Sequence, residues 1–236
     1  MKAFVISLET RQDRYEYIKQ NYIHNTIYDL EIIKAYDGKN INNNSENYNL
    51  LKNTFLNSIE DNKNKNKNIN NYNYLYIGDF TLGEVGCFVS HILLWKKIIN
   101  ENIDQALIFE DDCIFNVNFS NRLDNIIKNE MPPDYNILWI GGKMGDNYIN
   151  NKNNIISNNI AIKKEEHPYG TFSYIITRKC AQLLLSYIDT EFKGNLGVDY
   201  FMDEFLTKNN ITQHIVYPFI TYSIYDNNSI FRSDIR

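Results

Sequence analysis

A short apolar segment that ends in three consecutive acids, residues 105–112, constrains the fold of this chain most. Residues 105–109 are apolar enough for a strand that is buried on both faces, as in parallel sheets covered by helices. Residues 81–100, directly before it, repeat apolar side chains at helical spacing and begin with a capping-box pattern, Thr81 with Glu84. A helix followed by a buried strand predicts an α/β fold, with the acids at the carboxyl end of the sheet.

The rest of the chain alternates between strand and helix patterns in the same way. We expect strands at residues 3–8, 29–36, 136–140, 159–162, 171–176 and 215–221. We expect further helices at residues 11–24, 119–129, 179–187 and 198–207. This order predicts a single domain over residues 1–236, built on a Rossmann-type, mainly parallel sheet flanked by helices.

One segment departs from this pattern. Between residues 40 and 73, 15 of 34 positions are Asn, and residues 62–68 alternate Asn with Lys. We interpret the segment as a surface insertion, with a short helix over residues 48–59. The alternative is a lid, since long loops near a site often close over a ligand.

Charge and cysteine usage narrow the function classes. Lys and Arg total 24 against 29 Asp and Glu, which disfavours a nucleic-acid binder. An acidic protein that handles a phosphorylated ligand must neutralise it locally, with Arg, Lys or a metal. Cys87, Cys113 and Cys180 form neither a disulfide framework nor a zinc pattern. No signal peptide or membrane span is evident, so we expect a cytoplasmic protein.

The three acids after the strand predict a cation site. In an extended chain residues i and i+2 point the same way, so Glu110 and Asp112 can share a face and hold one divalent cation. Carboxylate oxygens suit Mg²⁺ or Mn²⁺. Asp111 points elsewhere, where it can accept a ribose hydroxyl. The alternative is a solvated acidic turn that merely ends a strand.

The helix over residues 81–100 carries unusual residues for its position. Gly83 and Gly86 lie in its first turns, where glycine costs helix stability, so close approach to a ligand or tight packing must compensate. Ser90 and His91 are polar residues in an apolar stretch. A lone histidine there is more often a hydrogen-bonded core group than a ligand.

Residues 81–112 resemble the central block of glycosyltransferase family 25, which includes bacterial lipooligosaccharide galactosyltransferases and procollagen galactosyltransferases. The shared pattern is Gly-Glu-x-Gly-Cys-x-x-Ser-His-x-x-x-Trp, followed by an apolar strand that ends in Glu-Asp-Asp. The chain departs from the family at Ser7-Leu8-Glu9, where the family usually has Asn-Leu, and at Phe88, where it often has Ala. Weaker resemblances extend over nearly the whole chain outside the insertion, at residues 5–14, 35–38, 137–143, 170–179 and 198–199.

The resemblance implies a GT-A fold, a UDP-sugar donor (UDP-galactose or another UDP-hexose), Mn²⁺, and inverting transfer to a hydroxyl of a glycan or collagen-like acceptor. A cation on Glu110 and Asp112 would neutralise the leaving diphosphate. Arg11 and Arg14 could contact the nucleotide or the diphosphate, although a solvated helix start explains them equally well. The matched blocks also place four residues in the donor site: Ser90, His91, Asp111 and Thr171.

An inverting transfer needs a base for the acceptor hydroxyl. Asp199 and Asp203 are four residues apart in an expected helix, where neighbouring like charges favour a base. Asp199 is preferred because it falls on the Val-Asp pattern of the family. The alternative is a solvated helix face, which also applies to Glu204.

Three aromatic or imidazole side chains have weaker claims to the site. His167 could bind a metal or a sugar. Tyr174 and Trp95 could stack on uracil or sugar, but core packing explains both better.

Two other function classes use the same residues. One is a metal-dependent phosphohydrolase or nucleotidyltransferase, for which the chain lacks a P-loop. The other is a non-catalytic glycan-binding module, which the intact acids at residues 110–112 count against.

Overall fold

The computed structural model describes residues 1–23, 28–38, 76–77, 80–142, 156–162, 170–192 and 197–223. The Asn-rich insertion at 40–73, with its expected helix, lies outside the described residues, and so does His167.

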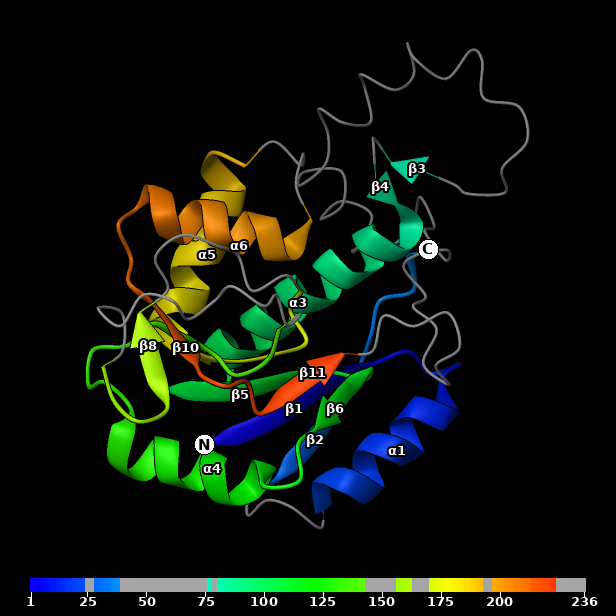
Figure 1. Cartoon of the computed structure of the whole chain (residues 1–236). Coiled ribbons are helices and arrows are strands. Elements are labelled where there is room, and N and C mark those ends of the chain that lie inside the picture. The colour runs from blue at the N-terminus through cyan, green and yellow to red at the C-terminus, as the bar shows by residue number, and fades with distance from the viewer. Residues whose placement is uncertain are drawn as a thin grey trace.

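A mixed sheet forms the centre of these residues, with seven strands in the order β2-β1-β5-β9-β7-β10-β8 (Figure 1). The strands are β1 Lys2–Ser7, β2 Leu30–Lys34, β5 Gln105–Glu110, β7 Ile137–Trp139, β8 Ile160–Ile162, β9 Ser173–Thr177 and β10 Gln213–Val216. β1 pairs in parallel with β2 and β5, and β7 pairs in parallel with β10. β9 is antiparallel to β5 and β7, and β8 is antiparallel to β10. Five of these strands therefore point the same way, which confirms the mainly parallel sheet.

Helices cover both faces of the sheet, as predicted (Figure 1). They are α1 Gln12–Ile23, α3 Leu82–Asn100, α4 Phe119–Asn125 with the π-helical turn η2 Ile126–Glu130, α5 Arg178–Thr190 and α6 Val198–Lys208. Phe4 and Ile6 of β1 share one buried cluster with α3, α5 and α6, whereas Ala3 and Val5 share another with α1 and α4. The period-2 alternation of a doubly buried strand builds these two cores.

Two short pairings lie beside the main sheet. β3 (Tyr76–Ile77) pairs with β4 (Phe80–Thr81), and β6 (Cys113–Phe115) pairs with β11 (Thr221–Ser223). The prediction of one strand over 215–221 is wrong, because these residues contribute to β10 and to β11, which belong to different sheets. Pro218 lies between the two strands, and proline has no N–H with which to continue a ladder.

The start of α3 follows from local chemistry. Thr81 Oγ1 accepts a hydrogen bond from the Glu84 N–H at 3.2 Å, and Glu84 Oε2 accepts one from the Thr81 N–H at 2.8 Å. This capping box provides acceptors for two backbone N–H groups at the helix N-terminus, which have no partner within the helix. The helix therefore begins at Leu82, as the sequence predicted. None of the helices within the described ranges combines the length and hydropathy of a membrane span.

The first turns of α3 pack directly against the backbone that follows β2. A Cβ added at Gly38 would lie 1.8 Å from the Leu82 carbonyl oxygen, and one at Gly86 would lie 2.6 Å from that of Tyr36. Ser90 Oγ links the same two segments, because it donates to the Gly86 carbonyl at 2.6 Å and accepts from the Tyr36 N–H at 2.8 Å. Tight packing therefore accounts for Gly86 in this helix.

Gly86→Ala should destabilise the protein, although alanine is the better helix former by about 1 kcal/mol. The added methyl group meets backbone on the facing segment, so helix and segment must separate at an expected cost of roughly 1–3 kcal/mol. Urea denaturation measures the change. Ser186→Ala, at an exposed position of α5, is the control and should change stability by less than about 0.5 kcal/mol. A Gly86→Ala protein as stable as the wild type would contradict the packing argument.

Candidate functional site

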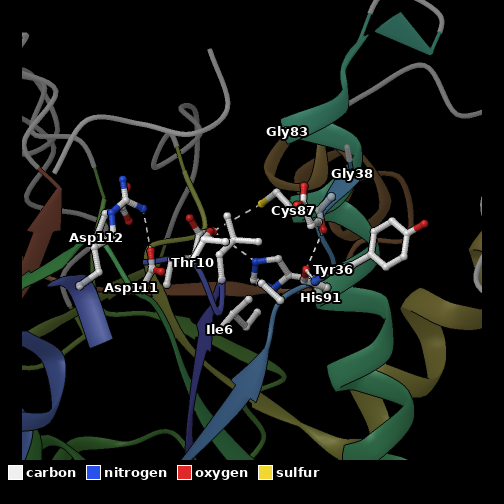
Figure 2. A pocket seen from close by; sticks show the side chains of 16 residues that line it. Ile6, Thr10, Tyr36, Gly38, Gly83, Cys87, His91, Asp111 and Asp112 are labelled. Atoms are coloured by element: carbon white, nitrogen blue, oxygen red, sulfur yellow. Dashed lines mark hydrogen bonds and ion pairs between the residues drawn. The ribbon is translucent and has the colours of Figure 1, made fainter. Parts of the chain in front are cut away.

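A cleft opens where the parallel strands β1, β2 and β5 end, against the first turns of α3 (Figure 2). Its lining comes from Thr10 and Arg14 after β1, residues 35–38 after β2, and Glu110–Asp112 after β5, with Cys87 and His91 on α3. This is the edge at which open α/β sheets bind their ligands. The three acids therefore lie in a cleft rather than in a solvated turn.

The three acids point to different partners, since the chain turns at Asp111 and Asp112 and the strand alternation ends at Glu110. Asp111 is almost completely buried. Its Oδ1 lies 2.7 Å from Arg14 Nη1, and its Oδ2 accepts a hydrogen bond from Ser7 Oγ at 2.9 Å. Asp111 thus links β1, α1 and β5, and it orients the Arg14 guanidinium at the cleft.

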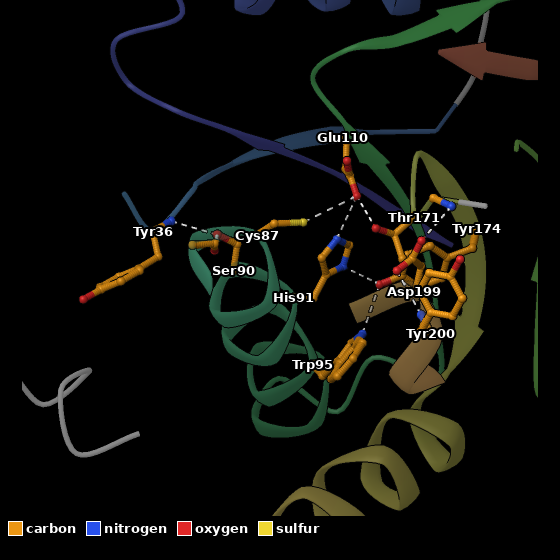
Figure 3. A network of polar contacts seen from close by, with 12 residues as sticks. Tyr36, Cys87, Ser90, His91, Trp95, Glu110, Thr171, Tyr174, Asp199 and Tyr200 are labelled. Atoms are coloured by element: carbon orange, nitrogen blue, oxygen red, sulfur yellow. Dashed lines mark hydrogen bonds and ion pairs between the residues drawn. The ribbon is translucent and has the colours of Figure 1, made fainter. Parts of the chain in front are cut away.

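Glu110 faces α3 and the residues before β9 (Figure 3). Its Oε1 lies 3.2 Å from His91 Nε2 and 3.9 Å from Cys87 Sγ, and it accepts a short hydrogen bond from Thr171 Oγ1. Burial by itself raises the pKa of Glu110. The hydrogen bonds from His91 and Thr171 outweigh that effect, so the pKa lies below its usual value. Glu110 is therefore held as an anion.

A chain of hydrogen bonds behind Glu110 sets the tautomer of His91 (Figure 3). Trp95 Nε1, which can only donate, lies 3.1 Å from Tyr174 Oη, and that oxygen lies 2.8 Å from His91 Nδ1. The ionised Glu110 can only accept, so His91 donates to it from Nε2–H, and in the neutral imidazole the Tyr174 hydroxyl then donates to Nδ1. Trp95 and Tyr174 are fully buried, which confirms the core interpretation of both residues.

Asp112 is the acid of the three with a carboxylate oxygen that lacks a hydrogen-bond donor among the described residues. Its Oδ2 accepts a long hydrogen bond of 3.4 Å from Ser223 Oγ, while its Oδ1 is buried and has no hydrogen-bond partner among the described residues. Burial, and then repulsion from Glu110, raises the pKa of Asp112 to about 7. A buried carboxylate oxygen without a donor fits a bound divalent cation, because a cation would offset both costs.

The charges that line the cleft also favour a bound cation. Within the described lining, four carboxylates face one guanidinium: Asp37, Glu110, Asp111 and Asp112 against Arg14. The guanidinium is already paired with Asp111. A polyphosphate could not enter such a cleft without a cation to neutralise it.

Two other predicted site residues, Arg11 and Asp199, do not belong to the described lining of the cleft. Arg11 pairs with Asp13, at 2.7 Å between Nη2 and Oδ2, and it does not contribute to the described lining. Asp199, in the first turn of α6, accepts hydrogen bonds from the Gly170 N–H at 3.0 Å and the Tyr200 N–H at 2.9 Å. Gly170 is next to Thr171, so Asp199 lies beside the Glu110 network (Figure 3).

Asp203 is engaged separately from Asp199. Its Oδ1 accepts a hydrogen bond of 2.7 Å from Gln213 Nε2, and Gln213 also accepts one from Trp139 Nε1 at 2.9 Å. The two aspartates therefore have different partners, and Asp203 is tied to the sheet at β10 and β7.

The sequence interpretation missed Cys87 as a site residue. Cys87 and His91 are four residues apart on α3, so both present side chains to Glu110, and all three cysteines are free. The Cys-x-x-x-His spacing is the signal that could have revealed them. This spacing is visible only when the cysteines are compared with histidine, and not when they are compared with one another. The role of Ser7 in holding Asp111 had no local signal, because the two lie 104 positions apart.

Comparison with known proteins agrees with this architecture. Residues 1–202 match the family described as glycosyltransferase family 25 (LPS biosynthesis protein). The chain is 25% identical to human procollagen galactosyltransferase 2 over 218 residues, which are 92% of this chain and 32% of that protein. It is 28% identical to zebrafish (Danio rerio) procollagen galactosyltransferase 1 over 221 residues, 91% of this chain and 33% of that protein. The chain thus spans about a third of these relatives.

One relative is named as inactive: the bovine (Bos taurus) "probable inactive glycosyltransferase 25 family member 3". The chain is 26% identical to it over 211 residues, which are 85% of this chain and 31% of that protein. Among solved structures, mouse xyloside xylosyltransferase 1 overlays with a TM-score of 0.44 and 12% identity, covering 97% of this chain and 85% of that one. That overlay is too loose to support an argument. The family match covers most of the chain, and the chain belongs to glycosyltransferase family 25.

Proposed function

We propose that this chain is an inverting glycosyltransferase that moves a hexose, galactose or glucose, from a UDP-sugar to a hydroxyl of a glycan or collagen-like acceptor. Membership of family 25 supports sugar transfer, and the names of the procollagen galactosyltransferases support a hexose. The acceptor follows from the same names and from the family description, which mentions LPS biosynthesis.

The observation that carries the proposal is the acidic cleft with the unsatisfied Asp112 Oδ1. A nucleoside diphosphate is an anion, and this lining repels it unless a divalent cation is bound. Asp112 would hold Mn²⁺ or Mg²⁺, and Glu110, whose charge is near enough to raise the pKa of Asp112, would be the second carboxylate ligand. The cation would act as a Lewis acid that stabilises the leaving diphosphate.

The remaining roles follow from which side chains reach the cleft. Arg14, oriented by Asp111, would donate to the nucleotide or its phosphates, and we assign this contact to Arg14 rather than to Arg11. Thr171 and His91 hold Glu110 in place. Ser90 would act indirectly, because its hydroxyl holds the segment after β2 against α3.

Asp199 is the proposed base. Its carboxylate is positioned by two backbone N–H groups next to Thr171, whereas Gln213 holds Asp203. Asp199 would take the proton of the acceptor hydroxyl as that oxygen attacks the anomeric carbon. The bond from this carbon to the diphosphate oxygen breaks as the new bond forms, with inversion, and the diphosphate leaves with the electron pair.

A donor screen tests the proposal. The protein is incubated with Mn²⁺ and UDP-galactose, UDP-glucose, UDP-N-acetylglucosamine or GDP-mannose, with and without a hydroxylysine peptide or an oligosaccharide acceptor. We expect Mn²⁺-dependent UDP release from one UDP-hexose. Acceptor should speed this release, and the acceleration should fall about 100-fold in Asp199→Asn, because a positioned base contributes that much. Asp189→Asn, at an exposed position of α5, is the matched control.

Two results would contradict the proposal. Phosphate release without sugar transfer would favour a phosphohydrolase that uses the same acids. No release from any donor, together with no thermal shift on adding UDP and Mn²⁺, would favour a non-catalytic binding module.

A further inference from the structure

We infer that Cys87, His91 and Glu110 form a second kind of metal site in the cleft, an open Cys-His-Glu site for a borderline transition metal such as Zn²⁺. The ligand atoms of these three side chains all lie within 4.8 Å of one another. The site shares Glu110 with the proposed carboxylate site, but a sulfur and an imidazole nitrogen supply its other two ligands. It is stated for the metal alone and does not depend on sugar transfer.

The spacing of the ligand atoms fits tetrahedral zinc. With metal–ligand distances of about 2.3 Å to sulfur and about 2.1 Å to nitrogen or oxygen, a tetrahedral ion places N and O about 3.4 Å apart and S and O about 3.6 Å apart. The observed separations are 3.2 Å from His91 Nε2 to Glu110 Oε1 and 3.9 Å from Cys87 Sγ to the same oxygen. Adjustments of a few tenths of an ångström would suffice for these two pairs.

Supporting hydrogen bonds are also in place. A metal-bound histidine usually donates its other ring N–H to an oxygen, and Tyr174 Oη lies 2.8 Å from His91 Nδ1. Thr171 Oγ1 holds the Glu110 carboxylate in the same way. Metal binding would release the thiol proton of Cys87 and shift the ring proton of His91 from Nε2 to Nδ1, so that Nε2 becomes the ligand. The Nδ1–H would then donate to the Tyr174 oxygen, whose hydroxyl hydrogen rotates away.

The fourth position of such an ion would face the cleft, because all three ligands line it (Figures 2 and 3). Three protein ligands with one open position are typical of zinc sites that bind water or a substrate oxygen. Thiolate and imidazole favour Zn²⁺ or Co²⁺ over Mg²⁺ or Mn²⁺. The site would therefore take an anionic oxygen ligand through a metal different from the one on Asp112.

Cobalt absorption tests the site directly, because a thiolate on Co²⁺ produces a near-ultraviolet charge-transfer band that oxygen ligands do not produce. We expect this band in the 236-residue chain titrated with Co²⁺, and its displacement by Zn²⁺. Cys87→Ala should abolish the band. Cys180→Ala, which removes a buried cysteine on α5, should keep it. Absence of the band from the wild type, or its persistence in Cys87→Ala, would overturn the inference.

A second measurement needs no variant, so it stands even if Cys87→Ala folds poorly. Iodoacetamide alkylation of the native protein is followed by mass spectrometry of the Cys87 peptide. Cys87 lines the cleft, whereas Cys113 and Cys180 are buried and serve as internal references. Zn²⁺ should slow alkylation of Cys87 at least tenfold, and Mg²⁺ should not. Equal alkylation with and without Zn²⁺ would also overturn the inference.

Discussion

Asp112→Asn should raise the melting temperature of the metal-free protein by roughly 4–8 °C while it lowers sugar transfer about a hundredfold or more. The wild-type Asp112 is half-buried beside Glu110, and its buried Oδ1 has no hydrogen-bond partner among the described residues. A pKa of about 7 in place of about 3.8 corresponds to at most about 4 kcal/mol. Partial exposure reduces this to about 2 kcal/mol, which gives the stated change in melting temperature.

The difference in stability between the wild type and Asp112→Asn should depend on pH. Because folding raises the pKa of Asp112, the contribution of this carboxyl group to the stability of the wild type falls as pH rises from about 4 to about 7. The asparagine variant lacks this contribution, so its advantage should grow over the same window and level off above pH 7. Differential scanning fluorimetry across this range, without metal, measures the difference.

Bound Mn²⁺ should make the wild type more stable than Asp112→Asn, the reverse of the order without metal. Mn²⁺ should stabilise the wild type and leave Asp112→Asn nearly unchanged, because the variant lacks a ligand. The loss of turnover follows from the several kcal/mol that a bound cation supplies to a leaving diphosphate. Asp189→Asn should behave as the wild type in both assays. An asparagine variant that is less stable than the wild type without metal, or equally stabilised by Mn²⁺, would contradict this account of Asp112.

Arg14→Met should lower the free energy of unfolding by about 3–5 kcal/mol. Only 6% of the Arg14 side chain and 9% of the Asp111 side chain are exposed, and their closest atoms are 2.7 Å apart. Removing Arg14 leaves the Asp111 carboxylate buried with the Ser7 hydroxyl but without its cation, which costs far more than a surface ion pair contributes. Urea denaturation of the single variants and of Arg14→Met/Asp111→Leu gives the coupling energy.

The double variant separates pairing from packing. If the pair is the cause, the double variant should lose less stability than the sum of the two single variants. Glu191→Gln removes a pair of similar length to Lys208, 2.8 Å, that is more than half exposed, and it should cost less than about 1 kcal/mol. An Arg14→Met protein that loses no more than this control would contradict the argument.

Much of the fold was predictable because it depends on neighbours in the sequence. The capping box at Thr81 and Glu84 acts over three residues, and the alternation of β1 divides its side chains between two cores. The single strand expected at 215–221 failed where Pro218 ended one ladder and the next strand joined another sheet. β6 was not expected because only two residues lie between it and β5, so no turn residues or polar segment separate the two strands in the sequence beyond the acids themselves.

The sequence by itself determined the α/β class, the place of the three acids at the end of β5, and the candidate residues on α3 and α6, because periodicity and motif spacing are local properties. Only the tertiary structure decided how these residues are used. It turned the three acids toward different partners, placed Cys87 and His91 against Glu110, buried Asp111 with Arg14, and held Asp203 on Gln213. These contacts join residues ten to about a hundred positions apart, so they depend on how strands pair and helices pack.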